Sequence, residues 1–422
     1  MPSICYESKS GSMSVADIRH MLMQSLENRT ITKALIIPPD ATRPHSGAGE
    51  ITAMYYELLS AKGIHADILP ALGTHSPMTR SEQLSFFGNI PVDRFLTHSW
   101  RDGVTTIGEV PSSFVCDISD GLMTESIPVQ VSDYLLDPSY DVILSVGQVV
   151  PHEVVGMANY TKNIVIGCGG SRFISASHML GAVYGIERIL GHIDTPVRKL
   201  LDYAEENFLL KLPIVYVLTV TETNLHNTDI VGLYIGHGDD KRNAFEQAAA
   251  LSQQRNITYV DQPIRNCIVW LDKDEFQSMW LGNKAVYRTR MAMADGGQLL
   301  VLAPGIKTFG EDPENDRLIR KYGYTGRRRI LKLCKSEPDL QHNMSAAAHL
   351  IHGSPEGRFQ IIYAAPQLGR EAIESVGYRY MDIEKAIQQY GLHDHENQDF
   401  DNKDFYFIRN PALGLWATKL SK

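Results

Sequence analysis

Four charged or titratable side chains follow short apolar segments in the first half of the sequence. They are Asp40, Arg43, His75 and His152. Arginine offers a planar fork that suits a carboxylate or a phosphate, and imidazole titrates near neutral pH, as a general acid or base does. Two bases on separate loops can flank one substrate, one at each face, which is the arrangement that a racemase needs. Any one of these residues alone is more often an ordinary polar loop residue.

Lys162 and His178 are two further candidates. Lys162 stands at the edge of an apolar run, where a lysine either extends its amine to water or takes part in chemistry. His178 lies near the start of a predicted helix, and a lone helical histidine is more often structural than a ligand. Asp40 also has several interpretations, because it can hold ribose hydroxyls, orient Arg43, or form a turn before Thr42.

The elements that must position these side chains alternate between strands and helices. Such alternation, with Val- and Ile-rich strands, predicts an α/β fold with parallel sheets. Ligands of open α/β sheets bind beyond the carboxyl ends of the strands, where the loop candidates lie. The expected strands are 34–37, 64–72, 142–146, 164–166 and 214–219, and the expected helices are 51–62, 81–87 and 177–190.

A second series of strands, at 268–271, 299–302 and 359–363, predicts a second domain. We therefore expect two α/β domains, each with a mostly parallel sheet flanked by helices, and an active site in the cleft between them. Residues 239–263 are expected to form one helix and a turn, residues 393–404 a loop, and residues 405–408 a strand. The predicted ranges are 1–262 for the domain with the cofactor and the catalytic histidines, 263–404 for the domain that closes the substrate site, and 405–422 for a tail able to return to the first domain.

Composition excludes several classes of protein. The 422 residues carry a formal charge of −9, which argues against nucleic acid or an anionic membrane surface as a partner. Five scattered cysteines without a CxxC motif exclude a zinc ribbon and make a disulfide framework unexpected, whereas 15 histidines favour imidazole as a metal ligand. No apolar run reaches the roughly 18 residues of a membrane span, and residues 1–14 are polar, so we expect a soluble cytoplasmic protein.

One glycine-rich motif suggests a different kind of site, one that binds a dinucleotide. The apolar run before Gly167-Cys168-Gly169-Gly170 looks like the strand and glycine loop of a dinucleotide site. Such a site needs an acidic residue at the end of a second strand about 20 residues later. Glu187 falls near that distance but within a predicted amphipathic helix, so we reject an NAD site here.

Taken together, the motifs resemble the lactate racemase family over most of the chain. The first is Asp-x-Thr-Arg-Pro at 40–44, and the second is Gly-x-His-x-Pro-x-Thr at 73–79. The third is a spacing counted from His152: Lys162 stands ten residues after His152, and His178 stands twenty-six residues after His152.

The resemblance implies a cofactor, the nickel-pincer nucleotide, in which a pyridinium-3-thioamide-5-thiocarboxylic acid mononucleotide binds Ni(II) through two sulfurs and a ring carbon. It implies that Lys162 links to this cofactor through a thioamide and that His178 is the fourth nickel ligand. Such soft donors with one imidazole favour a planar tetragonal site, which suits Ni(II). Asp40 is implied to contact the nucleotide.

The same resemblance implies that His75 and His152 are the acid/base pair. One takes the hydroxyl proton of a 2-hydroxy acid while C2 gives hydride to the cofactor, and hydride then returns to the other face of the planar keto acid. Arg43 is implied to bind the substrate carboxylate. Lys284, twelve residues before Gly296, is implied to contact substrate or cofactor; without the resemblance it reads as a solvated helix residue.

Three departures from the lactate enzymes concern the pocket rather than the reacting core. Leu281 replaces a glutamine, residues 158–161 replace a Ser-Gly-Gly-Arg run, and no tryptophan stands near 341–344. Segment 277–312 is similar to a branch that acts on sugar acids such as gluconate. Polar residues there suit a polyhydroxylated substrate or simply an ordinary polar helix; they are Asn283, Tyr287, Arg288 and Arg290.

The sequence therefore predicts an isomerase, a racemase or 2-epimerase of a 2-hydroxy acid, with an aldonate such as D-gluconate as first choice. Alternatives are a racemase of lactate, malate or another small hydroxy acid, a Zn- or Mn-dependent sugar-acid lyase, and a hydroxy-acid sensor without chemistry. Expected partners are the small-molecule substrate and the enzymes that synthesise the cofactor, with no nucleic acid and no membrane. A homo-oligomer is left open.

Overall fold

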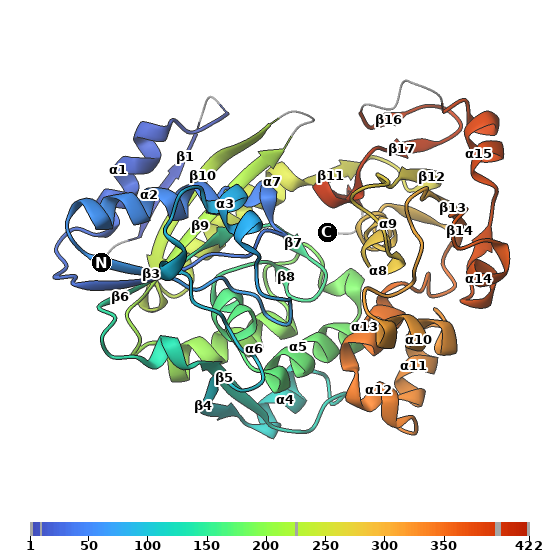
Figure 1. Cartoon of the computed structure of the whole chain (residues 1–422). Helices are drawn as coiled ribbons and strands as arrows, with labels where there is room; N and C mark the ends of the chain where they lie inside the picture. Colours follow the sequence, from blue (N-terminus) through green and yellow to red (C-terminus); the bar gives the residue numbers. More distant parts are fainter. Residues whose placement is uncertain (1–2, 9–10, 224–226, 393–397, 420–422) are drawn as a thin grey trace. The chain divides into compact units, whose positions relative to one another are not determined.

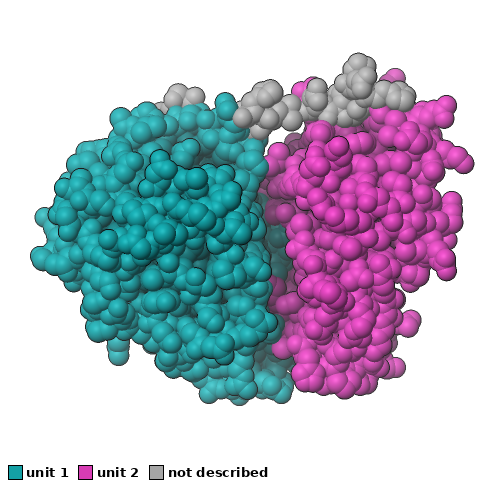
Figure 2. All heavy atoms as spheres, viewed as in Figure 1, with its two compact units in different colours: residues 1–177, 190–255 teal, residues 178–189, 256–422 magenta. Residues whose placement is uncertain are grey.

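The computed structural model describes residues 3–8, 11–223, 227–392 and 398–419. The chain divides into two compact units, shown in different colours in Figure 2. Unit 1 comprises residues 1–177 and 190–255, and unit 2 comprises residues 178–189 and 256–422. Each unit is built around its own six-stranded sheet.

The sheet of unit 1 has the order β1-β10-β9-β6-β2-β3 (Figure 1). Strands β9, β6, β2 and β3 are mutually parallel, whereas β10 pairs antiparallel with β9 and β1 with β10. β2 and β6 are almost wholly buried, as strands of a sheet covered on both faces are. The bounds are β1 (Ile4–Glu7), β2 (Lys33–Ile37), β3 (His65–Ile68), β6 (Val142–Gln148), β9 (Ile214–Thr223) and β10 (Thr228–His237).

Helices α1 and α2 pack on one face of this sheet, where Leu22 and Tyr55 join Ile36 and Leu144 in one apolar cluster. Smaller antiparallel pairs, β4 with β5 and β7 with β8, complete the strands of unit 1. The bounds are α1 (Val15–Ser25), α2 (Ala48–Ala61), α3 (Arg80–Phe87), β4 (Val104–Val110), α4 (Ser112–Ile118), β5 (Ile127–Ser132), β7 (Pro151–His152), β8 (Gly156–Met157), α5 (Ser171–Tyr184), α6 (Pro196–Ala204) and α7 (Asn243–Asn256).

The sheet of unit 2 has the order β15-β14-β13-β12-β17-β16, and only β16 runs antiparallel to its neighbour. β11 and β18 form a separate parallel pair. The strands are β11 (Ile257–Val260), β12 (Ile264–Trp270), β13 (Met293–Leu302), β14 (Gln360–Ala364), β15 (Arg379–Tyr380), β16 (Phe400–Asp401), β17 (Tyr406–Ile408) and β18 (Leu415–Thr418). The helices are α8 (Met279–Gly282), α9 (Lys284–Thr289), α10 (Pro313–Tyr322), α11 (Arg327–Leu333), α12 (Pro338–His342), α13 (Met344–His352), α14 (Arg370–Ser375) and α15 (Ile383–Tyr390).

The predicted α/β class is confirmed, with sheets rich in parallel strands and flanked by helices. One predicted strand is wrong, because residues 164–166 lie in the π-helical turn η4 (Asn163–Gly167). A short apolar run cannot be told from a buried helical turn by periodicity alone. The dinucleotide motif therefore lacks its strand. The helix expected at 177–190 begins earlier, at Ser171, and ends at Tyr184.

The C-terminal part of the chain differs from the expectation in two ways. β17 pairs with β12, so the tail lies in the sheet of unit 2 and does not return to the first domain. The second segment of unit 2 begins at Asn256 rather than 263, because β11 pairs with β18 of the tail. Residues 178–189, which were expected in the first domain, also belong to unit 2. Within the segment expected to be a loop, residues 393–397 lie outside the described residues and Phe400–Asp401 forms β16. In the described residues, no helix combines the length and apolarity needed to cross a bilayer.

Candidate active site

Asp40 and His75 form a hydrogen-bonded pair at the carboxyl ends of two neighbouring strands. Asp40 follows β2, and His75 follows β3, which runs parallel to β2. The His75 Nδ1 atom lies 2.5 Å from Asp40 Oδ2. The other oxygen, Oδ1, accepts hydrogen bonds from the backbone N–H of Thr42 at 3.1 Å and from its hydroxyl at 2.5 Å. The carboxylate of Asp40 therefore fixes both the turn and the histidine.

The charge of Asp40 determines which nitrogen of His75 carries the proton. Burial raises the pKa of Asp40, but hydrogen bonds from His75 and Thr42 and the positive charges nearby outweigh it, so the pKa lies below its ordinary value. An ionised carboxylate only accepts hydrogen bonds, so Nδ1 of His75 must be the donor. In the neutral imidazole Nε2 is then the basic nitrogen, on a side chain that is 50% exposed.

His152 is held in the opposite tautomer. It ends β7, shortly after β6, and its Nδ1 accepts a hydrogen bond from the backbone N–H of Val154 at 3.1 Å. A neutral imidazole whose Nδ1 accepts carries its proton on Nε2. His75 thus presents a basic Nε2, whereas His152 presents an Nε2–H donor.

Arg43 lies exposed on the loop after β2. Its Nη1 donates to the hydroxyl of Thr42 at 3.0 Å, and that hydroxyl in turn bonds Asp40. Within the described residues, no carboxylate forms an ion pair with Arg43. The guanidinium therefore keeps donors for an anionic group of a ligand.

Lys162 has an amine that is unusually easy to deprotonate. Burial lowers its pKa to about 8, with help from the positive charges of Arg43 and Arg198 and against the negative charges of Glu153 and Asp40. These electrostatic partners place Lys162 near the Asp40–His75 pair. About half of the amine is neutral at pH 8, whereas an ordinary lysine is almost entirely charged there.

Asn163 positions the lysine, and the sequence reasoning did not identify it. Its side-chain amide donates to the carbonyl of Ile37 at the end of β2 and to the hydroxyl of Ser145 on β6, both at 3.0 Å. The loop of His75 joins the same segment, because Gly73 N–H donates to the carbonyl of Gly167 at 2.8 Å. The signal available in the sequence was the position of the Asn163 amide, directly before the apolar run 164–166.

His178 lies on α5, partly buried, at the first residue of unit 2. Among the described residues, no group of three or more His, Cys, Asp or Glu side chains is arranged to hold a metal ion. A pincer that brings two sulfurs and a carbon needs only one protein ligand, and a partly exposed lysine of depressed pKa suits attachment of a carboxylic acid derivative. The chemistry of Lys162 is therefore compatible with attachment of the nickel-pincer nucleotide, while Lys162 as the attachment residue and His178 as the metal ligand stay predictions.

The polar residues of α8 and α9 divide into buried and accessible groups. Asn283 is fully buried and accepts hydrogen bonds from Tyr363 and Tyr378. Tyr287 bonds His349 through its hydroxyl at 2.7 Å. These side chains serve the interior of unit 2, so the expectation that they are surplus donors for a polyol is not supported.

Arg290 is also used inside unit 2. Its side chain is 1% exposed and pairs with Glu187 at 2.6 Å, and its Nη1 donates to the carbonyl of His352 at 2.7 Å. By contrast, three residues on one side of α8 and α9 remain partly exposed; they are Trp280, Leu281 and Lys284. Lys284 is thus partly exposed, with its Nζ 6.0 Å from the ring centroid of Phe276, and its role in substrate binding stays a prediction.

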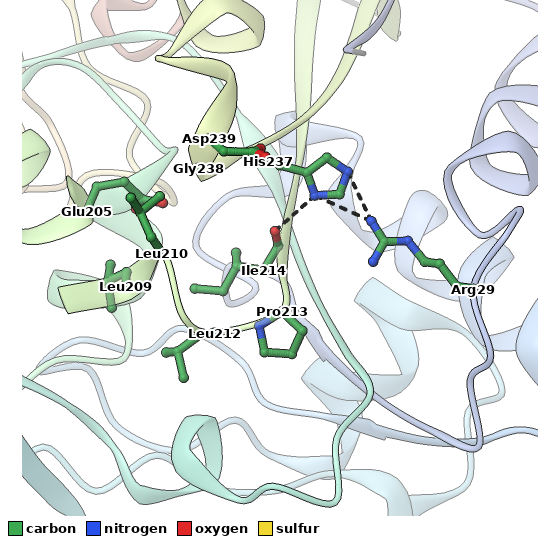
Figure 3. A pocket seen from close by; sticks show the side chains of 10 residues that line it. All are labelled: Arg29, Glu205, Leu209, Leu210, Leu212, Pro213, Ile214, His237, Gly238 and Asp239. Atoms are coloured by element: carbon green, nitrogen blue, oxygen red, sulfur yellow. Dashed lines mark hydrogen bonds between the residues drawn. The ribbon is translucent and has the colours of Figure 1, made fainter. Parts of the chain in front are cut away.

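Two cavities of unit 1 lie apart from these side chains. One, of about 280 Å³, is lined by Arg29, His237 and Glu205 and lies at the amino end of β9 (Figure 3), opposite to Asp40 and His75. The other, of about 880 Å³, is lined by Ala41 and Pro44 together with the starts of α2 and α3. None of the candidate site residues lines either cavity.

Comparison with known proteins finds similarity in one part of the sequence and in the overall fold. Residues 18–187 match the family described as lactate racemase N-terminal domain, a stretch that contains every candidate site residue except Lys284. A crystal structure of a protein from Thermotoga maritima is similar over 98% of this chain and 100% of that chain, with 25% identity and a TM-score of 0.82. The lactate racemase apoprotein from Thermoanaerobacterium thermosaccharolyticum is similar over 96% of this chain and 93% of that chain, with 17% identity and a TM-score of 0.69.

None of the curated proteins matches this sequence significantly. Residues 18–187 are thus similar to the N-terminal domain of lactate racemase, and the chain shares its overall fold with the two solved structures.

Proposed function

We propose that the chain is a racemase or 2-epimerase of a 2-hydroxy acid that uses the nickel-pincer nucleotide, with an aldonate such as D-gluconate as the first substrate to test. The observation that carries the proposal is the Asp40–His75 pair with Lys162 beside it at the carboxyl ends of β2 and β3. This is the edge at which open α/β sheets bind ligands.

The chemistry explains why a base alone is insufficient. The C2–H bond beside an ionised carboxylate is a very poor acid, so simple proton abstraction is slow. When bound, the cofactor supplies a hydride acceptor, which avoids a carbanion. Nε2 of His75 takes the hydroxyl proton of one stereoisomer, and Asp40 stabilises the imidazolium that results.

His152 has the complementary role. Its Nε2–H donates a hydrogen bond to the substrate oxygen while Val154 holds Nδ1. Nε2 becomes the base for the opposite stereoisomer only after the ring leaves the Val154 N–H and its proton moves from Nε2 to Nδ1. Arg43 binds the substrate carboxylate, and Lys284 is proposed from the family resemblance as a second positively charged contact.

The choice of an aldonate rests on a partly exposed aromatic side chain of α8, Trp280. The Trp280 ring stacks on His349 with centroids 4.1 Å apart and an interplanar angle of 12°. Burial lowers the pKa of His349 to about 3, and Tyr287 and Tyr324 hydrogen-bond its two nitrogens, so the histidine is neutral and fixed. A fixed, partly exposed indole suits the C–H face of a sugar acid better than a three-carbon acid.

The test is mass spectrometry of the protein produced together with the cofactor-synthesis enzymes and nickel, followed by assays on gluconate, lactate and malate. We expect added mass on Lys162 and C2 inversion of gluconate, with deuterium at C2 retained in the product. Full activity with an unmodified Lys162 would contradict the covalent cofactor. Extensive loss of deuterium to solvent would indicate proton abstraction instead.

A further inference from the structure

The segment that carries Lys162 has an unusual backbone. Asn159 and Tyr160 both adopt left-handed conformations, with φ of 66° and 59°, although neither is glycine, and both are buried. Each such residue costs on the order of 1–3 kcal/mol and persists only where its surroundings impose it. The contacts that impose this turn therefore determine where Lys162 lies.

Arg198 holds the backbone of the turn. It lies on α6 and is fully buried, and its Nη2 donates to the carbonyl of Met157 at 2.8 Å and to that of Asn159 at 3.2 Å. Its guanidinium lies 4.2 Å from the ring centroid of Phe245. That ring stacks on Tyr160 with centroids 5.4 Å apart, so one cation ties the turn to α7.

Glu205 holds the other end of the turn. Its Oε2 accepts a hydrogen bond from the hydroxyl of Thr161 at 3.0 Å and another from the hydroxyl of Tyr216. The Tyr216 ring in turn lies 4.2 Å from that of Tyr160. Burial raises the pKa of Glu205 to about 7, although these two hydrogen bonds lower it. Figure 3 shows Glu205 on the wall of the cavity opposite Arg29.

We propose that Arg198 and Glu205 are positioning residues for Lys162, which fix the left-handed turn so that the amine is presented to the cofactor. This inference rests on the proposed role of Lys162 as the attachment residue. Both side chains follow Lys162 by more than thirty positions in the sequence, and their contacts converge on the five residues directly before it. Without them the turn relaxes toward ordinary backbone angles and the lysine moves toward water.

Thr161→Val is the sharpest variant, because it removes the hydroxyl that bonds Glu205 and changes no charge around Lys162, where Arg43, Arg198, Glu153 and Asp40 act. Glu205→Gln is the second variant. Thr161→Ser keeps the hydroxyl and is the rescue control. Ser25→Ala is a matched control, since the buried Ser25 hydroxyl also lies within hydrogen-bond distance of a tyrosine hydroxyl, that of Tyr55 at 2.8 Å, elsewhere in unit 1.

Two readouts are made on each variant. The apparent pKa of Lys162 in the apoprotein is taken from the pH dependence of its arylation by fluorodinitrobenzene, followed by peptide mass spectrometry. Cofactor occupancy of Lys162 is measured after incubation with the cofactor-synthesis enzymes and nickel. Thermal unfolding reports stability in parallel.

For Thr161→Val and Glu205→Gln we expect the Lys162 pKa to rise from about 8 to about 9 as the amine gains water, and occupancy to fall about tenfold. Thr161→Ser and Ser25→Ala should match the wild type. Wild-type Lys162 pKa and occupancy in both variants would overturn the positioning role, even if their stability falls. A shifted pKa with a wild-type Lys162 that never takes the cofactor would support positioning and refute the proposed function.

Discussion

Asp40→Asn should reverse the tautomer of His75. In the wild type, two donors of Thr42 occupy Oδ1, and Oδ2 accepts from His75. An asparagine must keep its oxygen toward Thr42, so its amide NH2 faces Nδ1 of His75. Nδ1 then becomes an acceptor, and the proton moves to Nε2. Neither His75 nor His152 would then hold a basic Nε2.

The size of the effect follows from the hydrogen bond that is lost. A bond to a charged group is worth about 1.5–3 kcal/mol, and about 1.4 kcal/mol corresponds to a factor of ten in rate. We expect C2 inversion by the cofactor-loaded enzyme to fall about 10- to 150-fold, mainly in kcat. Because the ratio of kcat/KM in the two directions is fixed by the equilibrium constant, a loss confined to kcat should be the same in both directions.

The assay is the initial rate of inversion in both directions, combined with 15N NMR of histidine-labelled protein to identify the protonated nitrogen. Asp67→Asn is the matched control, because Asp67 forms the same kind of bond with His65, at 2.9 Å, on β3 outside the site. An Asp40→Asn protein with wild-type rates, or one whose His75 keeps its proton on Nδ1, would refute this reasoning.

Three further predictions concern stability. Lys162→Met should stabilise the apoprotein by about 3 kcal/mol at pH 7, because the folded state lowers the pKa of this lysine from 10.5 to about 8. The cost is complete below pH 8 and disappears above pH 10.5, so urea unfolding at pH 7 and pH 10.5 should show the gain only at the lower pH. Asn163→Ala removes two buried hydrogen bonds and should lower the free energy of unfolding by about 1–3 kcal/mol, measured by the same method. Glu187→Gln leaves the buried Arg290 without its counter-charge and should lower the free energy of unfolding by about 3 kcal/mol. The control is Glu222→Gln, in a surface pair with Arg255, which should lower it by less than about 1 kcal/mol. Equal losses in the two variants would contradict the buried-pair interpretation.

The sequence was sufficient to predict which side chains stand at the carboxyl edge of the first sheet. β2 and β6 are near-continuous apolar runs, so their ends are visible in the sequence, and the rule for open α/β sheets selects the loops that follow. Asp40 and His75 were found in this way. That they bond each other was not predicted, because it depends on β2 and β3 being neighbours and on the register between them.

Other features could not be predicted from the pattern of residues in the sequence. The segment 163–167 is apolar like a strand, but the buried Asn163 bonds the end of β2 and a serine hydroxyl of β6, and the backbone winds into a π-helical turn. Arg290 looked like a donor for substrate, because a sequence shows its charge and not its partner, Glu187, which stands 103 positions earlier. Long-range pairs of this kind are decided by tertiary packing.

The two histidines show how one residue type acquires two functions from different kinds of contact. The proton position of His75 is set by a carboxylate from the neighbouring strand, so it depends on the topology of the sheet. The proton position of His152 is set by the N–H of Val154, only two residues later, so it depends on a local turn. A carboxylate stabilises the imidazolium that forms after proton uptake, whereas a backbone N–H aimed at Nδ1 opposes it. His75 is therefore prepared as a base, whereas His152 must first break its hydrogen bond with Val154. The two directions of inversion thus start from histidines with different hydrogen bonds and proton positions.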